Sequence, residues 1–209
     1  MNFIKIFNDG GFVMYPLAFM SVVIVALAIE RMLFWTKIGK RQKPLVRTVL
    51  DLYQRESPLV IERLEREQDL PIARIFMAAI RMKDATPDEF RLAMESEVHA
   101  EIPLLRRFIS EFDAVIGLAP LLGLLGTVTG LIVSFSSLKV GEVAGSSSGS
   151  VVSGISEALV STASGVIVAV FASVFANLFR SFYQRETSKI QESMGQLELI
   201  HRRYWQRGA

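Results

Sequence analysis

The stretch VVSGISEALVSTASGVIVAVFASVFANL, residues 151–178, decides the fold of this chain. It is long enough to cross a bilayer, because about 20 apolar residues span a hydrocarbon core of roughly 30 Å. Glu157 is the one charged residue in the run from Val143 to Leu178. A charge at the centre of a spanning helix costs roughly 2.5–3.5 kcal/mol on insertion scales and usually faces a bundle interior or a water-filled path. Glu157 is therefore the first candidate for a functional residue.

Two further uncharged runs can span a membrane, Phe12–Ile29 with 18 residues and Ala114–Leu138 with 25 residues. Hydrophobic residues make up 51% of the chain and are concentrated in these blocks. The first block is preceded by a single basic residue and lacks a small-residue cleavage pattern, so we expect it to stay in the membrane. The sequence thus predicts an all-α integral membrane protein with transmembrane helices at 12–35, 112–138 and 151–179.

The distribution of Lys and Arg predicts the orientation of the three spans. One basic residue precedes the first span, fourteen lie between Thr36 and Glu111, one lies between the second and third spans, and six follow from Arg180 onward. The positive-inside rule then places the amino terminus outside and the carboxyl terminus inside. We expect a periplasmic amphipathic N-terminus at 1–11, a cytoplasmic helical loop at 36–111, a periplasmic hairpin at 139–150 and a cytoplasmic helical tail at 180–209.

The loop between the first two spans has the sequence pattern of helices. Thr86 can cap a helix that has Pro87 at its first position and Glu89 at its third. We expect this helix to run into the second span, disturbed at Pro103, and shorter helices to start near Pro58 and Pro71. An apolar stripe at heptad-like spacing supports the long helix and consists of Leu92, Val98, Ile102, Leu105, Ile109 and Phe112. A second apolar stripe continues the third span inward and consists of Ile190, Met194, Leu197, Ile200 and Tyr204.

Several classes of function are disfavoured by the composition. The formal net charge is +2, so no nucleic-acid partner is expected. The chain has no cysteine, and its two histidines, His99 and His201, lie far apart among charged residues, where we expect solvated positions. An intramembrane enzyme is disfavoured, because no paired carboxylates, no His/Cys set and no Ser–Lys or Ser–His pair lies at membrane depth. Three spans without an inverted repeat also disfavour a secondary transporter. We expect no cofactor and no metal.

Polar and small residues follow one face of each of the last two spans. At about 100° per residue, the polar positions of the third span lie within roughly 40° of Glu157. Gly126 and Gly130 add a GxxxG pattern, which is typical of close helix packing. The stripes consist of Ser150, Ser153, Glu157, Ser161 and Ser164 on the third span, and of Gly123, Thr127, Gly130, Ser134 and Ser137 on the second. Such faces can oppose each other or line a pore.

Glu157 distinguishes a functional face from a packing face. Packing needs no carboxylate, and the apolar runs of the three spans contain no basic residue that could pair with Glu157 in the same subunit. Carboxyl groups at membrane depth favour the protonated form and can exchange protons near neutral pH, as a proton-coupled device requires. We also expect a ring of subunits, because a three-helix monomer of this size should not bury both stripes.

The sequence resembles the TolQ, ExbB and MotA family of inner-membrane motor subunits. Two segments close to the core motifs of this family carry the resemblance, LGLLGTVTG at 122–130 and GISEALVSTASG at 154–165. The three-span layout, with Glu30 and Arg31 after the first span, is similar too. Three spans and Glu157 favour the ExbB/TolQ branch over the four-span flagellar stators.

The resemblance implies a bacterial inner-membrane protein that forms a homopentamer around a dimer of a single-span ExbD/TolR-like subunit. Proton flow would then drive movement of that partner and, beyond it, of a TonB-like or TolA-like protein. The pore residues implied are Thr127, Glu157 and Thr162. Thr162 lies about 140° from Glu157 around an ideal helix, so their joint role rests on the resemblance and not on periodicity.

Two interpretations remain open at this point. In the first, the chain is a motor or channel subunit that converts the proton-motive force into work, with membrane lipids around it and the proton as the coupling ion. In the second, it is a structural scaffold whose small-residue stripes only pack helices. The sequence does not separate TonB-type uptake from Tol-type envelope maintenance, gliding or secretion, or protons from sodium ions.

Overall fold

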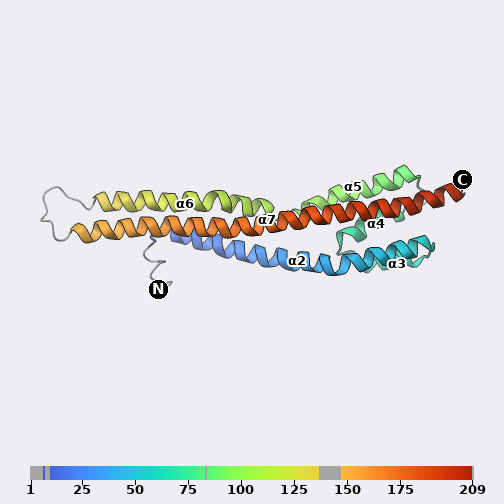
Figure 1. The fold of residues 1–209 in the computed structure, drawn as a ribbon, viewed down its shortest axis with the longest axis horizontal. Coiled ribbons are helices and arrows are strands. Elements are labelled where there is room, and N and C mark those ends of the chain that lie inside the picture. The colour runs from blue at the N-terminus through green and yellow to red at the C-terminus, as the bar shows by residue number, and fades with distance from the viewer. Residues whose placement is uncertain (1–6, 8–9, 83, 137–146, 209) are drawn as a thin grey trace. The chain divides into compact units, whose positions relative to one another are not determined.

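A computed structural model describes the chain except residues 1–6, 8–9, 83, 137–146 and 209. The described residues form helices and no strands (Figure 1). The helices are α2 (Met14–Gln54), α3 (Leu59–Glu65), α4 (Pro71–Ile80), α5 (Pro87–Leu105), α6 (Ile109–Ser136) and α7 (Ser147–Gly208). Most of the predicted hairpin and of the predicted N-terminal segment lies outside the described residues. Ser147 to Ser150, which we assigned to the hairpin, belong to α7.

Three stretches, in α2, α6 and α7, are long and apolar enough to cross a membrane. Between 22% and 28% of the residues in these stretches are buried inside the chain. Large apolar side chains such as Phe19, Leu121 and Phe171 are exposed. Soluble monomers rarely expose contiguous apolar surface of this extent. The chain is a multi-pass membrane protein, which confirms the predicted all-helical fold with three apolar helices. The ring and the orientation of the spans stay predictions.

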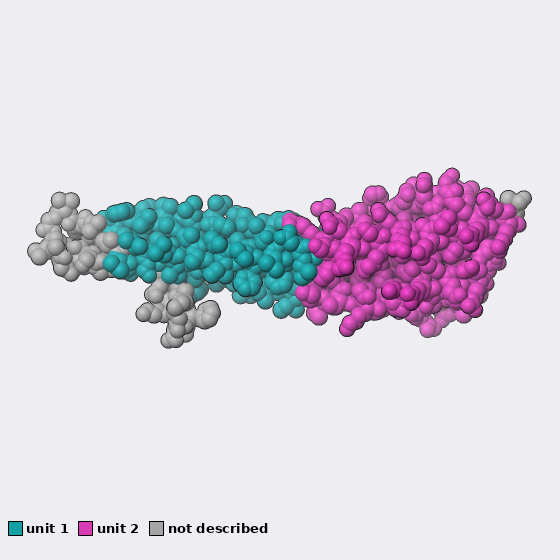
Figure 2. All heavy atoms as spheres, in the orientation of Figure 1, with its two compact units in different colours: residues 1–30, 108–179 teal, residues 31–107, 180–209 magenta. Residues whose placement is uncertain are grey.

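The chain divides into two compact units (Figure 2). The span unit comprises Met1–Glu30 and Phe108–Phe179. The charged unit comprises Arg31–Arg107 and Arg180–Ala209. The span unit holds Glu157 and both small-residue stripes, so the candidate site lies within it.

The predicted helix from Thr86 into the second span is interrupted close to the expected disturbance at Pro103, since α5 ends at Leu105 and α6 begins at Ile109. Pro103 has no N–H to donate to the preceding turn and weakens the end of α5. Phe108 then adopts a left-handed backbone with φ of 68°, which no α-helix continues. The predicted start of α5 is confirmed, since Thr86 and Glu89 form a reciprocal capping box.

The charged unit has its own apolar core. α4 buries almost one whole side, Ile72, Ala73, Ile75, Phe76, Met77 and Ala79. The stripe of the tail is confirmed at Ile190, Met194 and Leu197, which are buried. Leu92, placed on the α5 stripe, is instead 65% exposed, and Phe90 and Met94 are buried in its place. Phe90 and Met94 each lie two residues from Leu92, because this part of α5 follows the core of the charged unit and not a straight seam into α6.

His201 is not a solvated residue, so that interpretation is wrong. Its ring stacks on Phe90 at 4.0 Å between centroids and 9° between planes. Its Nε2 lies 2.9 Å from the carbonyl oxygen of Ala85, and its Nδ1 lies 2.8 Å from the hydroxyl of Tyr53. A carbonyl oxygen only accepts, so Nε2 carries a proton, and in the neutral ring Nδ1 accepts from the Tyr53 hydroxyl. Burial raises the pKa of Tyr53 to about 12.

A buried ion pair joins α4 to α5. Glu101 is 6% exposed, and its carboxylate accepts hydrogen bonds from Nε and Nη2 of Arg74, the latter at 2.5 Å. This hydrogen bonding raises the pKa of Arg74, against its partial desolvation. Removing one partner of a buried pair is destabilising because it leaves a charge without compensation.

We expect Arg74→Ala to lower the free energy of unfolding by about 3 kcal/mol, since it leaves the Glu101 carboxylate buried and unpaired. Glu101→Ala should lower the free energy of unfolding by less, because the Arg74 side chain is 30% exposed and can be hydrated. Thermal unfolding of the purified protein, followed by circular dichroism, measures both. Arg91→Ala is the control and should cost under about 1 kcal/mol, because its pair with Glu95 is exposed on both sides. Equal losses for Arg74→Ala and Arg91→Ala would contradict a stabilising role of the buried pair.

Candidate functional site

Two threonine hydroxyl groups meet between α6 and α7. Thr127 Oγ1 and Thr162 Oγ1 form a hydrogen bond, and both also lie close to the carbonyl oxygen of Gly123, at 3.2 Å and 3.1 Å. Thr127 Oγ1 is 3.2 Å from the carbonyl oxygen of Ala158 as well. Each hydroxyl has one hydrogen and can accept others. The two hydroxyls therefore have more acceptors within reach than hydrogens to donate, and the direction of the bond between them can reverse.

Glu157 extends from α7 toward the residues that precede α2. Its side chain is half-buried. A Cβ atom built on Gly11 would lie 1.7 Å from Glu157 Oε1, so the carboxylate occupies the space that any larger residue would need. Gly11 also has a φ of 69°, a left-handed conformation that favours glycine. No hydrogen bond or ion pair joins Glu157 to any residue in the described part of the chain.

The site residues thus form two groups within the span unit. Thr127 and Thr162 contact each other across α6 and α7, whereas Glu157 contacts Gly11 and has no hydrogen bond to either threonine. This arrangement follows from the five-residue step from Glu157 to Thr162, which turns the two side chains about 140° apart on one helix. The sequence stripe around Glu157 therefore does not include Gly11, which the Glu157 carboxylate contacts.

Three glycines of α6, Gly123, Gly126 and Gly130, lie against α7 of the same chain, and Figure 1 shows the two helices side by side. A Cβ on Gly123 would lie 2.9 Å from the carbonyl oxygen of Ser161, and one on Gly126 would lie 2.4 Å from the Ser161 hydroxyl oxygen. A Cβ on Gly130 would lie 2.9 Å from the carbonyl oxygen of Gly154. Backbone approaches as close as these are open only to residues without side chains.

The serines of the two stripes are distributed differently. Ser134 and Ser161 are buried, and their hydroxyls donate to the carbonyl oxygens of Gly130 at 2.8 Å and Ala158 at 2.9 Å. Ser164 is half-buried and donates to Val160 at 2.8 Å. Ser153 is exposed. The side chain of Ser150 and all of Ser137 lie outside the described residues. The stripe of α7 is therefore divided between the interface with α6 and the surface.

The expectation that a single chain should not bury both small-residue stripes holds for the α7 stripe and not for the α6 stripe. Gly123, Gly130 and Ser134 of α6 are buried against α7, whereas Ser153 of α7 is exposed and Glu157 and Ser164 are half-buried. The physical reason is that glycine and serine let two helix backbones approach closely, so the α6 stripe needs little volume. What a single chain leaves exposed is apolar surface, including Leu118, Leu124, Val128 and Ile132 of α6.

Comparison with known proteins places these residues in a family. The sequence pattern of the MotA/TolQ/ExbB proton channel family matches residues 67–192. The chain is 50% identical over 195 residues to a Synechocystis sp. protein described as biopolymer transport protein ExbB-like 3, and the match covers 93% of each chain. It belongs to the MotA/TolQ/ExbB proton channel family. A second Synechocystis sp. protein, ExbB-like 1, is 37% identical over 200 residues, which cover 95% of this chain and 79% of that protein.

A more distant relative extends the MotA/TolQ/ExbB likeness to another organism. The ExbB homolog of Methanothermobacter thermautotrophicus is 25% identical over 198 residues, which cover 94% of this chain and 67% of that protein. The family match includes Thr127, Glu157 and Thr162. Membership assigns the chain to the class of transport motor subunits of the MotA/ExbB type.

Sequence reasoning missed two groups of residues in this MotA/TolQ/ExbB family chain. Gly11 contacts Glu157 but lies before the first span and before the family match. The Gly10–Gly11 pair is a turn signal that could have marked this backbone as unusual. Gly154 and Gly165 complete the interface from the α7 side, since a Cβ on Gly165 would lie 2.4 Å from the carbonyl oxygen of Ala119. Both glycines belong to the motif GISEALVSTASG at 154–165, but periodicity does not distinguish them as residues of the helix interface.

Among the described residues, no group of His, Asp and Glu side chains is arranged to hold a metal ion. The chemistry of the site is that of the hydroxyl groups of Thr127 and Thr162 and the carboxyl group of Glu157. These groups accept, donate and transfer protons, and they offer no nucleophile with an adjacent base. The arrangement therefore suits proton transfer more than bond making.

Proposed function

We propose that the chain is an ExbB/TolQ-like subunit of a proton-driven motor in the inner membrane. One observation supports this more than any other. Glu157 is the single ionisable residue in an uncharged span, and in the described part of the chain it has neither a hydrogen-bond partner nor an ion pair. A carboxylate that served only the structure would be paired, because an unpaired charge inside the membrane is costly. An unpaired one is free to bind and release a proton.

The two threonines support a proton path near this carboxyl group. Thr127 and Thr162 share hydrogens with each other and with the Gly123 carbonyl oxygen, so a proton can be passed along hydroxyl groups at membrane depth. Water entering beside the half-buried Glu157 would connect the carboxyl group to this pair. In this proposal Glu157 is the proton-binding residue, and the threonines line the path.

The partners in this proposal follow from family membership. The chain forms a homopentameric ring in the inner membrane, oriented N-out and C-in, around a dimer of an ExbD/TolR-like single-span subunit. A TonB-like or TolA-like protein receives the movement, for outer-membrane transport or for envelope integrity. The apolar side chains of α6 that a single chain leaves exposed provide surface for these contacts.

The experiment is to co-express the chain with a single-span partner that carries a membrane aspartate, and to measure native mass and proton flux. In lipid nanodiscs the native mass should be a multiple of 23.3 kDa plus the partner. In vesicles with an imposed membrane potential, a pH-sensitive dye should report proton entry when both subunits are present and little when either is absent. A native mass of one chain, with no flux in the presence of the partner, would contradict the proposal.

The glycine packing of α6 against α7 favours a second candidate, a membrane scaffold without transport. Close packing against α7 is enough to explain glycine at positions 123, 126 and 130, with no need for a proton path. The two candidates differ in flux, since a scaffold forms the complex and conducts nothing. An intact complex with no proton flux at any potential would therefore favour the scaffold.

A further inference from the structure

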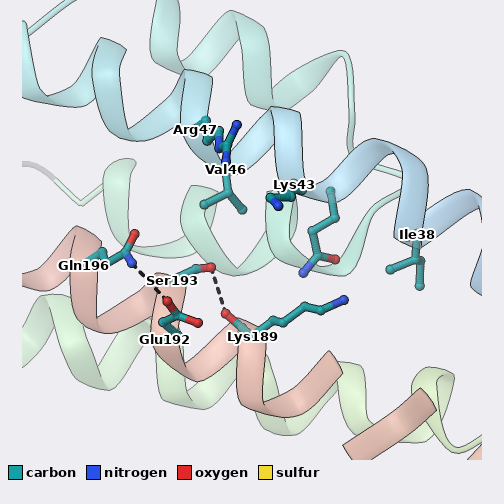
Figure 3. A pocket seen from close by; sticks show the side chains of 10 residues that line it. Ile38, Lys43, Val46, Arg47, Lys189, Glu192, Ser193 and Gln196 are labelled. Carbon is teal, nitrogen blue, oxygen red and sulfur yellow. Dashed lines mark hydrogen bonds between the residues drawn. The ribbon is translucent and has the colours of Figure 1, made fainter. Parts of the chain in front are cut away.

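A groove runs between α2 and α7 within the charged unit. Two hollows of about 480 Å³ and 330 Å³ share Gly39 and Lys189, so they form one continuous groove, here called the α2–α7 groove. Figure 3 shows the larger hollow, with Lys189 extending from α7 beneath Ile38 of α2. Apolar residues Met32, Trp35 and Phe182 line the smaller hollow.

Three buried polar atoms on the walls of this groove have no hydrogen-bond partner. They are Trp35 Nε1, Gln42 Oε1 and Glu186 Oε1, and the described part of the chain contains one further such atom. The residues are 7%, 4% and 4% exposed. Buried polar groups in folded proteins are nearly always paired, so three unpaired atoms in one groove indicate that a polar group from outside belongs there.

Gly39 supports this interpretation from the opposite wall. A Cβ atom on Gly39 would have no atom within 4 Å, so the packing of this chain does not require a glycine there. Glycine inside a helix is destabilising compared with alanine. The missing side chain keeps the middle of the α2–α7 groove open.

The charges of the groove favour an anion. Lys43, Arg47, Arg185 and Lys189 line it, against the carboxylates of Glu186 and Glu192. Lys189 pairs with Glu186 at 3.2 Å. Among the described residues, Lys43, Arg47 and Arg185 have no ion-pair partner. The α2–α7 groove thus carries an excess of positive charge beside an unpaired N–H of Trp35.

The groove follows directly on the membrane spans in the sequence. The uncharged run of the first span ends at Ile29 and that of the third at Phe179, so Met32, Trp35 and Phe182 lie within a turn or two of each end. Tryptophan is enriched where the hydrocarbon meets the headgroups, and basic pockets beyond the spans bind anionic headgroups. An apolar entrance followed by cations matches the order of acyl chain and phosphate in a phospholipid.

We propose that the α2–α7 groove binds the headgroup of an anionic phospholipid. The phosphodiester lies near Arg185 and Lys189 and accepts the Trp35 N–H, and the headgroup hydroxyls reach Gln42 and Glu186. The first acyl carbons contact Met32 and Phe182. Lys43 and Arg47 attract the anion from the other end of the groove.

The test measures lipid binding to the full-length protein by native mass spectrometry from mild detergent. The probes are phosphatidylglycerol and phosphatidylcholine with the same acyl chains. We expect phosphatidylglycerol to remain bound at lower lipid concentration than phosphatidylcholine. The double variant Lys43→Gln and Arg185→Gln removes two unpaired cations and should weaken phosphatidylglycerol binding roughly 30-fold, with little change for phosphatidylcholine.

Two controls keep this test decisive. Arg203→Gln with Arg207→Gln removes the same charge from exposed positions further along α7 and should leave binding unchanged. Gly39→Glu places a carboxylate in the open middle of the groove and should weaken phosphatidylglycerol binding, whereas Gly39→Gln should have a smaller effect. Circular dichroism checks that each variant is folded.

Four results would overturn the proposal. Equal affinity for the two lipids would mean that the protein does not distinguish their headgroups. An equal loss of phosphatidylglycerol binding in the Arg203/Arg207 control would mean nonspecific attraction. Competition by inorganic phosphate at the concentration of the lipid would assign the site to a soluble anion. A change of oligomeric mass in the groove variants, with lipid binding kept, would assign the groove to a second copy of the chain.

Discussion

Replacing Glu157 by glutamine is expected to abolish proton-driven function while the complex still assembles. Glutamine keeps the length and hydrogen-bonding capacity of the side chain but cannot bind and release a proton at its amide. It also fits beside Gly11, because the amide is nearly the size of the carboxyl group. Glu157→Asp keeps an ionisable group on a shorter side chain and should retain part of the activity. Complementation of a strain that lacks the chain, with native mass measured in parallel, tests all three proteins.

The control is Glu111→Gln, which removes the same charge from an exposed position in the first turn of α6. It should complement fully. Full complementation by Glu157→Gln, with the native mass preserved, would rule out proton coupling through this residue and favour the scaffold. A complex that no longer forms would show instead that the carboxyl group is needed for assembly. Proton flux in vesicles separates these cases, because loss of flux with an intact complex is expected from the motor alone.

Replacing Gly130 by leucine is expected to separate α6 from α7. The added side chain would meet the Gly154 carbonyl oxygen at 2.9 Å and the Ala158 nitrogen at 3.2 Å, both backbone atoms that cannot rotate away. Overpacking of a well-packed interface costs about 1–3 kcal/mol, and more where backbone must move. The gain of about 1 kcal/mol from removing a helical glycine does not offset this. We expect a lower unfolding temperature and less protein in the membrane fraction.

Gly117→Leu is the matched control in the same helix. A Cβ on Gly117 would have no atom within 4 Å, so a side chain there meets no wall in this chain. The unfolding temperature of the dissociated chain should be unchanged or slightly raised, because leucine favours helix more than glycine does. Equal loss in the Gly117 and Gly130 variants would show that leucine harms α6 for reasons other than contact with α7.

Much of the fold could be predicted from the sequence, because the membrane imposes simple requirements. Each span needs an uncharged run of sufficient length, and the three runs became the apolar parts of α2, α6 and α7. The start of α5 was also predictable, since the capping box involves only Thr86 and residues within one turn of it. Its end was not. The apolar pattern continues past Arg106 and Arg107. A left-handed backbone usually occurs at glycine, and Phe108 gives no such signal in the sequence.

The candidate site was predictable in its residues and not in its contacts. Periodicity shows that Gly123, Gly130 and Ser134 share a face of one helix, but it does not show which helix opposes that face. For the same reason it left open whether the two stripes oppose each other or line a pore, whereas in the structure α7 of the same chain covers Gly123, Gly130 and Ser134. The contact between Glu157 and Gly11 joins positions 146 residues apart in the sequence, which no local pattern can reveal.

The contact between Gly11 and Glu157 constrains how this sequence can change over evolution. A residue larger than glycine at position 11 cannot coexist with the present position of the carboxylate, and position 11 also needs a left-handed backbone. A lineage that gains a side chain at position 11 must therefore turn or shorten the side chain at position 157. The two positions are expected to vary as a pair, so that the segment ahead of the first span is tied to the one carboxyl group inside the third.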